Sequence, residues 1–480
     1  MSKINPLELP EITLRVAEFL DEKDLVRCVS VCKSWHQTLL RSIWKKVAAI
    51  DSVLFRTPQG LSDDSLMQHR DLVQELEIHE NFSRFYTITY PELHTLTIVD
   101  DNPNRETLDR KAYPEELIAF NPSLVHLKVV RLGRNLLAPF WTAVSGLLHL
   151  KTLTLQDVTM KDTYSLGEFW SACQNLERLC IRQSRISAEG LEVGDNLIFH
   201  KMQALELHLP KHVDQKKQLD MIRRCPNIQD LTWNVVGDEN NVLDLFAQDA
   251  ARELWPKLDS LSLSHSITDE TLALVISAIP KITNLDVCNS GFGPESFQAL
   301  KRHFKTLVKL NISKCPATTS AMLQEIMCSC PRLEELRGDC LNATQDVVGG
   351  LPWMCLSLRI LEVCIKFDDH SEDLQPVVFD RISLLIHLRS LAIGSPGLWE
   401  TMVFRQALDL RLVSGLGSLE TLKNIRHFGF YNTTQRFSKV EIEWMIEKWK
   451  KLDRVDGIVS DNTNHNALRK MLKDNDIIIS

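Results

Sequence analysis

A short leucine pattern, L-x-x-L-x-L, recurs through most of the 480-residue chain and constrains its fold more than any other feature. Clear copies begin at Leu124, Leu150 and Leu176, and from Leu124 to Ile228 the copies start 26 residues apart four times running. Later copies start 24 to 33 residues apart. One unit of this length cannot bury its own leucines, so neighbouring units must stack and share a continuous core.

The residues before each copy complete the unit. Proline stands two residues before the pattern six times, at Pro91, Pro122, Pro226, Pro256, Pro280 and Pro331. Proline there ends a helix and permits an extended strand. The residue three before the pattern is mostly apolar, which suits the inward side of a helix's last turn. Each unit therefore reads strand, turn, helix, turn, and the predicted fold class is α/β: a curved solenoid with a parallel sheet on the concave face and helices on the convex face.

The pattern also predicts which side chains are available for binding. Residues between the leucines alternate away from the core, so they should point from the concave face. The candidate target-binding residues are Lys128, Thr154, Glu206, Thr232, Asp286, Asn311, Arg337 and Glu362, with Cys180 and Ser262 in the same register. Further copies are expected at Val73-Leu76-Ile78, Leu419-Leu422 and Leu452-Val455, with a closing helix at Asn466 to Lys473 and a strand at Ile477 to Ile479.

Residues 70 to 458 resemble the leucine-rich repeats, in particular the cysteine-containing subfamily. Ser266-Ile267-Thr268-Asp269 followed by Leu272 is similar to that subfamily's turn into the helix. Cys315, eight residues after Leu307, stands at its signature Cys/Asn position. The resemblance implies a protein-binding solenoid.

The first fifty residues differ from the array, because their apolar residues recur at helical spacing. Pro10 suits the first position of a helix, Asp24 is a plausible N-cap for a second helix, and a third begins near Trp35. The three apolar stripes are Ile12, Val16, Phe19 and Leu20; then Leu25, Cys28, Val29 and Cys32; then Trp35, Leu39, Ile43 and Val47, with Leu40 and Trp44 beside them. So small a core usually needs a partner for stability.

This stretch resembles the F-box. The motifs that carry the resemblance are Leu9-Pro10, Asp24-Leu25, Val31-Cys32-Lys33-Ser34-Trp35 and Ile43-Trp44. This chain departs from the family pattern at one point. The family usually has one residue between Leu-Pro and Glu-Ile, whereas here Pro10 is followed directly by Glu11. The resemblance implies binding to the Skp adaptor of cullin–RING ubiquitin ligases. The implied adaptor-binding residues are Leu9, Pro10, Ile12, Val16, Phe19, Leu20, Leu25, Val29, Val31, Cys32, Trp35, Leu39 and Trp44. The alternative is that these helices only cap the solenoid.

Composition and motifs narrow the function classes. A net charge of -8 disfavours a general nucleic-acid or membrane surface. No apolar run approaches the length of about 18 residues that a membrane span needs, and the N-terminus lacks a signal pattern. The 12 cysteines are therefore expected to be reduced, in the cytoplasm or nucleus. Spacings such as Cys28/Cys32, Cys328/Cys330 and His208/His212 give little support to a metal site.

Phosphate-loop and nucleophile-elbow motifs are absent, so no catalytic residue, cofactor or metal is expected. Trp141, Trp170, Trp353 and Trp399 lie off the repeated core positions. Some of them could face a ligand, although packing under loops is the more common role of such residues.

These features predict four segments: an F-box at 1–50, a linker or cap at 51–69, the solenoid at 70–458 and a C-terminal cap at 459–480. On the two resemblances, the expected function is that of a non-catalytic substrate-recognition subunit of a Skp–cullin–F-box (SCF) ubiquitin ligase. The F-box would bind the Skp adaptor and through it a cullin, and the arc would bind a target protein. The alternatives are a binding or sequestering module whose F-box acts as a cap or a cullin-independent tether, and an enzyme within the array.

Overall fold

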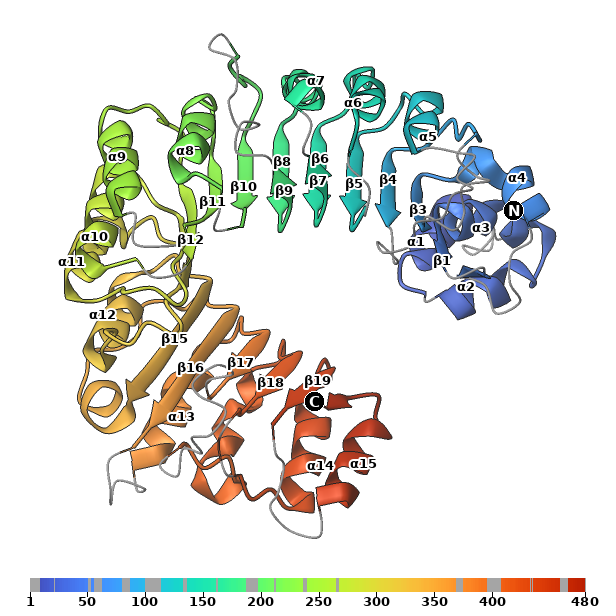
Figure 1. Cartoon of the computed structure of the whole chain (residues 1–480). Helices are drawn as coiled ribbons and strands as arrows, with labels where there is room; N and C mark the ends of the chain where they lie inside the picture. The colour runs from blue at the N-terminus through green and yellow to red at the C-terminus, as the bar shows by residue number, and fades with distance from the viewer. Residues whose placement is uncertain are drawn as a thin grey trace, which may run out of the picture. The chain divides into compact units, whose positions relative to one another are not determined.

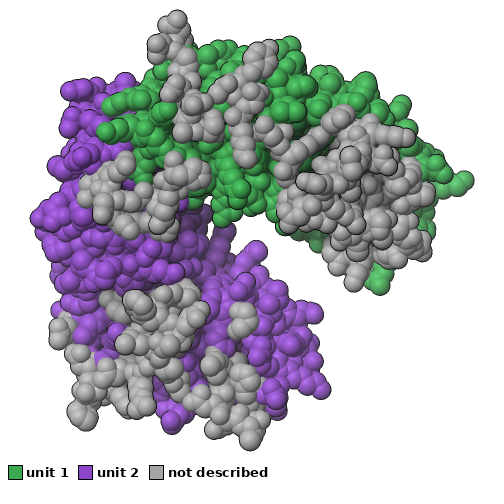
Figure 2. Space-filling view, viewed as in Figure 1, with its two compact units in different colours: residues 1–228 green, residues 229–480 purple. Residues whose placement is uncertain are grey.

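The structure is a computed structural model, and its chain divides into two compact units, residues 1–228 and 229–480 (Figure 2). The structure describes residues 9–479 with these gaps: 21, 51–52, 56–62, 80–86, 100–113, 133–135, 161–162, 187–196, 211–212, 236–239, 265–266, 368–373, 395–406, 432, 434 and 458–464.

The first unit begins with three short helices, α1 (Pro10–Ala17), α2 (Glu22–Val29) and α3 (Lys33–Trp44). Pro10 occupies the first position of α1, as predicted. Two details of the prediction are wrong. Asp24 lies inside α2 and does not cap it, because the helix already begins at Glu22. Val47 belongs to a strand rather than to the third helical stripe, because α3 ends at Trp44.

A sheet follows directly, and its first strand starts earlier than the leucine pattern indicates. β1 (Lys46–Ile50) pairs in parallel with β3 (Glu75–His79) and antiparallel with β2 (Val53–Phe55). The remaining strands, all parallel, are β4 (Thr95–Val99), β5 (His126–Val130), β6 (Thr152–Gln156), β8 (Arg178–Arg182) and β10 (Ala204–His208). The short strands β7 (Thr159–Met160) and β9 (Arg185–Ile186) form a separate pair. The helices are α4 (Asp63–His69), α5 (Pro114–Phe120), α6 (Ala138–Ser145), α7 (Thr163–Cys173) and α8 (Gln215–Arg223).

The second unit continues the same plan with parallel strands in sequence order. Its strands are β11 (Asp230–Asn234), β12 (Ser260–Ser264), β13 (Asn284–Asp286), β14 (Lys309–Asn311), β15 (Glu335–Asn342), β16 (Ile360–Lys366), β17 (Ser390–Ala392), β18 (His427–Gly429), β19 (Arg454–Asp456) and β20 (Ile478–Ile479). Its helices are α9 (Asn240–Ala251), α10 (Asp269–Ala278), α11 (Pro294–Leu300), α12 (Ser320–Ser329), α13 (Gln375–Ser383), α14 (Lys439–Lys448) and α15 (His465–Lys473). The predicted closing helix and strand correspond to α15 and β20.

In both units the helices cover one face of the sheet and leave the other open (Figure 1). We call the uncovered side the open face. The repeated leucines stand opposite one another across the ladder, as Leu261, Leu285 and Leu310 do, and all three are buried under the helices. Stacking thus joins single leucines into one shared core, and the predicted repeat fold is confirmed. The boundaries of the four predicted segments stay a prediction.

One predicted repeat is misplaced. Leu419 lies in a 3-10 helical stretch, Leu416–Thr421, and not before a strand. The strand of that repeat is β18, in which Phe428 pairs with Leu391 of β17. Its core residues are Ile425, Phe428 and Phe430, all fully buried. Phenylalanines replace the leucines in this strand. The leucine pattern therefore matches the 3-10 stretch before the strand and misses the strand itself.

Three of the four tryptophans off the leucine register belong to the core. Trp141, Trp170 and Trp353 are all buried, so none of them faces a ligand. Trp141 packs edge-on against Phe169, with ring centroids 4.8 Å apart. Trp399 lies outside the described residues.

Candidate protein-interaction surfaces

Several large apolar side chains on and beside the helices α1 to α3 are exposed. Phe19, two residues after the end of α1, is 81% exposed, and Val31, between α2 and α3, is 66% exposed. Leu9, Pro10, Ile12 and Cys32 are also exposed. Leu14, which is not among the adaptor-binding residues that the F-box resemblance implies, is exposed as well. Large apolar side chains held in water in this way mark a surface that another protein can cover.

Not all thirteen predicted adaptor-binding residues lie on that surface. Leu25, Leu39 and Trp44 are buried in this structure, so they are not part of the exposed surface, and their role in adaptor binding stays a prediction. Leu39 is only 1% exposed and packs with Ala17 and Leu25. The remaining predicted residues, Val16, Leu20, Val29 and Trp35, are partly buried. The helical stripes could not separate these groups, because inward and outward residues share the same short helices.

On the open face of the first unit, the mid-strand residues form one row, as the leucine spacing predicts. Lys128, Thr154, Cys180 and Glu206 are successive partners across β5, β6, β8 and β10. Lys128 is exposed, Thr154 and Glu206 are partly buried, and Cys180 is buried.

Glu206 is already engaged within this row. Its carboxylate accepts hydrogen bonds from Arg182 Nε at 2.5 Å and from Arg182 at a second nitrogen at 2.9 Å. Burial alone would raise the pKa of Glu206, but the hydrogen bonds from Arg182 and Cys180 and the nearby charges of Arg182 and His208 lower it overall. Burial and the adjoining Glu206 raise the pKa of the Cys180 thiol to about 12, which keeps it protonated at neutral pH.

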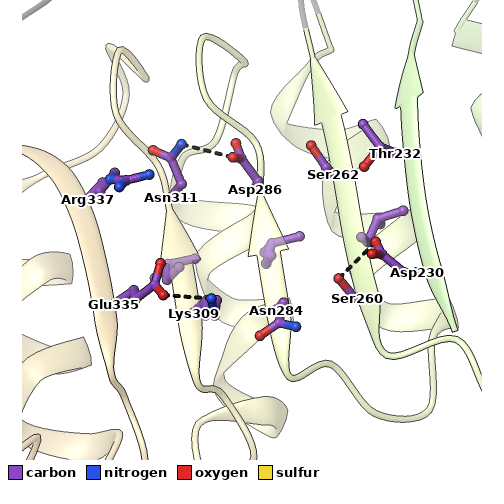
Figure 3. A pocket seen from close by; sticks show the side chains of 13 residues that line it. Asp230, Thr232, Ser260, Ser262, Asn284, Asp286, Lys309, Asn311, Glu335 and Arg337 are labelled. Carbon is purple, nitrogen blue, oxygen red and sulfur yellow. Dashed lines mark hydrogen bonds and ion pairs between the residues drawn. The ribbon is translucent and has the colours of Figure 1, made fainter. Parts of the chain in front are cut away.

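The open face of the second unit carries the other predicted target-binding residues, again in register. Thr232, Ser262, Asp286, Asn311, Arg337 and Glu362 are successive partners across β11 to β16. The first five of them border a shallow pocket of about 260 Å³ that runs over β11 to β15 (Figure 3), and Glu362 lies beyond it on β16. All six are partly exposed, so this row can meet a partner without rearrangement.

The pocket walls are polar and mutually bonded. Asn311 donates to Asp286 at 3.0 Å, Ser260 donates to Asp230 at 3.2 Å, and Lys309 lies 2.6 Å from Glu335 (Figure 3). The guanidinium of Arg337 lies 3.0 Å from the Glu362 carboxylate. Both signs of charge and neutral amides alternate along the strands, which suits a polar protein surface better than a single charged ligand.

A further polar cluster lies on β17 to β19, and the sequence reading did not find it. Ser390 Oγ lies 2.8 Å from His427 Nδ1, and His427 Nε2 lies 2.9 Å from Asp456 Oδ2. The buried Asp456 carboxylate also bonds Tyr431 and, at 2.8 Å, Arg454 Nε. Members of the cluster are up to 66 residues apart in sequence, so only the strand register could have revealed it.

The described part of the chain offers neither a metal site nor a membrane span. No group of three His, Cys, Asp or Glu side chains there could hold a metal ion, and no helix there is long and apolar enough to cross a membrane. His212 of the His208/His212 pair lies outside the described residues.

Comparison with known proteins identifies the front of the chain. Residues 10–49 match the F-box-like family. No curated protein sequence matches the chain.

Several solved structures have a similar arrangement at low identity. A leucine-rich-repeat protein of Leptospira interrogans is 14% identical, covers 87% of this chain and 98% of its own, and has a TM-score of 0.40. The yeast Rad7 and Elc1 complex gives 14% identity, 96% and 94% coverage and a TM-score of 0.43. An internalin of Listeria monocytogenes is 12% identical, and the match covers 95% of this chain and 93% of the internalin, with a TM-score of 0.24. The chain therefore carries an F-box-like domain at residues 10–49, followed by a leucine-rich-repeat fold of stacked parallel strands.

Proposed function

We propose that this protein is the substrate-recognition subunit of an SCF ubiquitin ligase. The observation that carries the proposal is the exposed apolar surface of the F-box-like domain, above all Phe19 and Val31. F-box domains generally bind Skp-type adaptors, and leaving a phenylalanine in water is explained when an adaptor covers it. The polar open faces then remain available to a target protein.

The proposed mechanism is positional. The F-box-like domain attaches to the adaptor and cullin, while an open face holds the target near the ubiquitin-charged conjugating enzyme. Proximity and orientation accelerate transfer, so no residue of this chain need be catalytic. An interface of standard size, roughly 1,600 Å² in total, is expected at each contact. The protein would act where SCF ligases assemble, in the cytoplasm or nucleus.

Co-purification with the Skp adaptor and a cullin tests the proposal. The full chain is compared with a Phe19→Ala/Val31→Ala variant, which removes surface contacts without touching the buried Leu39 core. We expect the wild type to retain both partners. With the variant, the recovered amounts of adaptor and of cullin should each fall at least tenfold. The matched control is Leu148→Ala, an equally exposed leucine outside the F-box-like domain at 79% exposure, which should behave as the wild type.

Each other outcome has a defined meaning. Adaptor without cullin would favour a sequestering module with a cullin-independent tether. No adaptor with the wild type would reduce the helices to a solenoid cap and overturn the proposal. Equal losses in Leu148→Ala would show non-specific capture.

A further inference from the structure

Three arginines occupy the same position in three consecutive repeats of the second unit. Arg359, Arg389 and Arg426 each stand directly before a strand, β16, β17 and β18. The backbone ladder places them in one row, because Arg389 N–H donates to Arg359 O at 2.8 Å and Arg426 N–H donates to Arg389 O at 2.8 Å. We call these residues the arginine row. It lies along the edge of the sheet where the strands begin.

The arginine row is not a general property of that position. The residues before the other strands of the unit, β11 to β15, β19 and β20, are Gln229, Asp259, Thr283, Val308, Glu334, Asp453 and Ile477. None of them is basic, and the whole chain carries a net charge of -8. Three adjacent cations therefore stand out against an acidic background.

The charges of the row are incompletely compensated. All three side chains are exposed. Arg359 lies 3.4 Å from the Glu334 carboxylate. Among the described residues, Arg389 and Arg426 form no ion pair and no side-chain hydrogen bond. Like charges on neighbouring strands repel, since the strands are only about 4.8 Å apart, and a bound anion would relieve that repulsion.

Apolar surface adjoins the row. Three residues before Arg359 and Arg389 stand Leu356 and Ile386, both about half exposed. The corresponding residue before Arg426 is the exposed Lys423. Asn424 Nδ2 donates to Ile386 O at 3.4 Å, which places these two repeats side by side at this level. Two exposed aliphatic side chains therefore stand in the turns that lead into the arginine row.

We propose that the arginine row binds a short acidic segment of the target protein, in which glutamate or aspartate residues adjoin a large apolar residue. Arginine suits this task because its planar guanidinium pairs with carboxylates through two parallel hydrogen bonds. Three arginines on neighbouring strands span roughly 10 Å, which is the length of three residues of an extended peptide. The inference rests on the proposed function only in calling the ligand a target.

Fluorescence anisotropy of the full chain, without adaptor, tests this proposal. The probe is a fluorescein-labelled peptide, Gly-Leu-Gly-Glu-Glu-Glu-Gly, and the comparison peptide has glutamine at the three glutamate positions. We expect the wild type to bind the glutamate peptide at least tenfold more tightly than the glutamine peptide. Affinity should fall between 50 and 200 mM salt, as it does for exposed charges.

An Arg389→Glu/Arg426→Glu variant should bind the glutamate peptide at least tenfold more weakly than the wild type does. The matched control is Arg252→Glu/Arg332→Glu, which makes the same charge change at two exposed arginines of the same unit. Equal affinity for the two peptides, or an equal loss in the control, would overturn the proposal. Binding only when the glutamates are replaced by phosphoserines, or tighter binding of single-stranded DNA, would also overturn it.

Failure of this proposal is separable from failure of the proposed function. The peptide measurement needs no ligase subunit, and Arg389→Glu/Arg426→Glu leaves the F-box-like domain intact. This variant should therefore co-purify with the adaptor as the wild type does, whatever the peptide result.

Discussion

Asp269 links two neighbouring repeats through a single side chain. It is the first residue of α10, and its carboxylate accepts the N–H groups of Gly293, Glu295 and Ser296, each at 2.9 Å. It thereby caps the start of α11, which belongs to the next repeat. Burial opposes ionisation, but these hydrogen bonds outweigh burial and lower the pKa of Asp269 below 3.8. Its stabilising contribution is therefore complete above pH of about 4 and is lost as pH falls through the lowered pKa.

Replacing Asp269 by alanine should lower the free energy of unfolding of the second unit by about 1–3 kcal/mol, because three N–H groups lose their acceptor. Urea denaturation of the full chain at pH 7 measures the loss. Glu270→Ala is the control, since Glu270 is exposed and adjacent. Equal stability of the two variants would show that water replaces the carboxylate without cost.

His303 gives the second unit a pH dependence. It is buried, its Nδ1 accepts the N–H of Ile282 at 3.2 Å, and its Nε2 lies 3.2 Å from the Ile276 carbonyl oxygen. This arrangement fits the neutral ring. Burial lowers the pKa of His303, the Ile276 carbonyl opposes that effect, and the charge of Arg302 adds to it. Because the unfolded chain takes up the proton at a higher pH, stability should fall as pH drops below about 6.5 and level off below the lowered pKa.

The measurement is urea denaturation of the full chain between pH 7.5 and 5. His303→Gln should be about 1–3 kcal/mol less stable at pH 7.5, because it disturbs a buried hydrogen-bond pair. Its stability should also depend less on pH than that of the wild type. His387→Gln, at an exposed histidine, should keep the wild-type slope. Parallel slopes in all three proteins would rule out His303 as the titrating group.

At the level of the element, the sequence predicts the positions of the strands better than the side-chain contacts between neighbouring repeats. Leucines at fixed spacing recur because each strand must bury the same two positions, so the open-face residues Asp286 and Asn311 are predictable from periodicity alone. The contacts that join repeats are not. Ser390, His427 and Asp456 meet because three strands align, and the unequal loops between them hide that alignment. At the front, Val47 reads as helical because its apolar neighbours continue the helical spacing, although the chain has already turned into β1.

The repeat that contains β18 illustrates how a phenylalanine can replace the expected leucine. Phe428 is fully buried, with its ring centroid 5.0 Å from Trp449 and 5.7 Å from Phe430. In Phe428→Ala the lost aromatic core should cost about 3–5 kcal/mol. Because each repeat is supported only by its neighbours, amide hydrogen exchange in β17 to β19 should accelerate about a hundredfold or more.

The control for this element is Val413→Ala, which truncates an apolar side chain that is 84% exposed. Its exchange pattern should match that of the wild type. Uniform acceleration throughout the second unit in Phe428→Ala would show that this unit unfolds as one block and not repeat by repeat.

On the scale of the whole molecule, the chain separates two kinds of surface. The F-box-like domain exposes apolar side chains such as Phe19, whereas the open faces present polar rows such as Asp286 and Asn311. An apolar surface suits a permanent partner, and a polar surface suits an exchangeable one. Binding at the two kinds of surface should therefore be separable by substitution.

Charge reversal of the open faces tests that separation. Glu206→Lys/Asp286→Lys should weaken target recovery at least tenfold, because both substitutions reverse the charge that the open faces present to a partner, and Glu206→Lys also places a cation beside Arg182. Adaptor recovery should stay unchanged. Quantitative mass spectrometry of co-purified proteins compares this variant with wild type and with Phe19→Ala/Val31→Ala. The recovered proteins should fall into two sets, one lost with each variant. If both variants deplete the same set, the F-box-like domain and the open faces act as one binding surface, and the receptor mechanism proposed above fails.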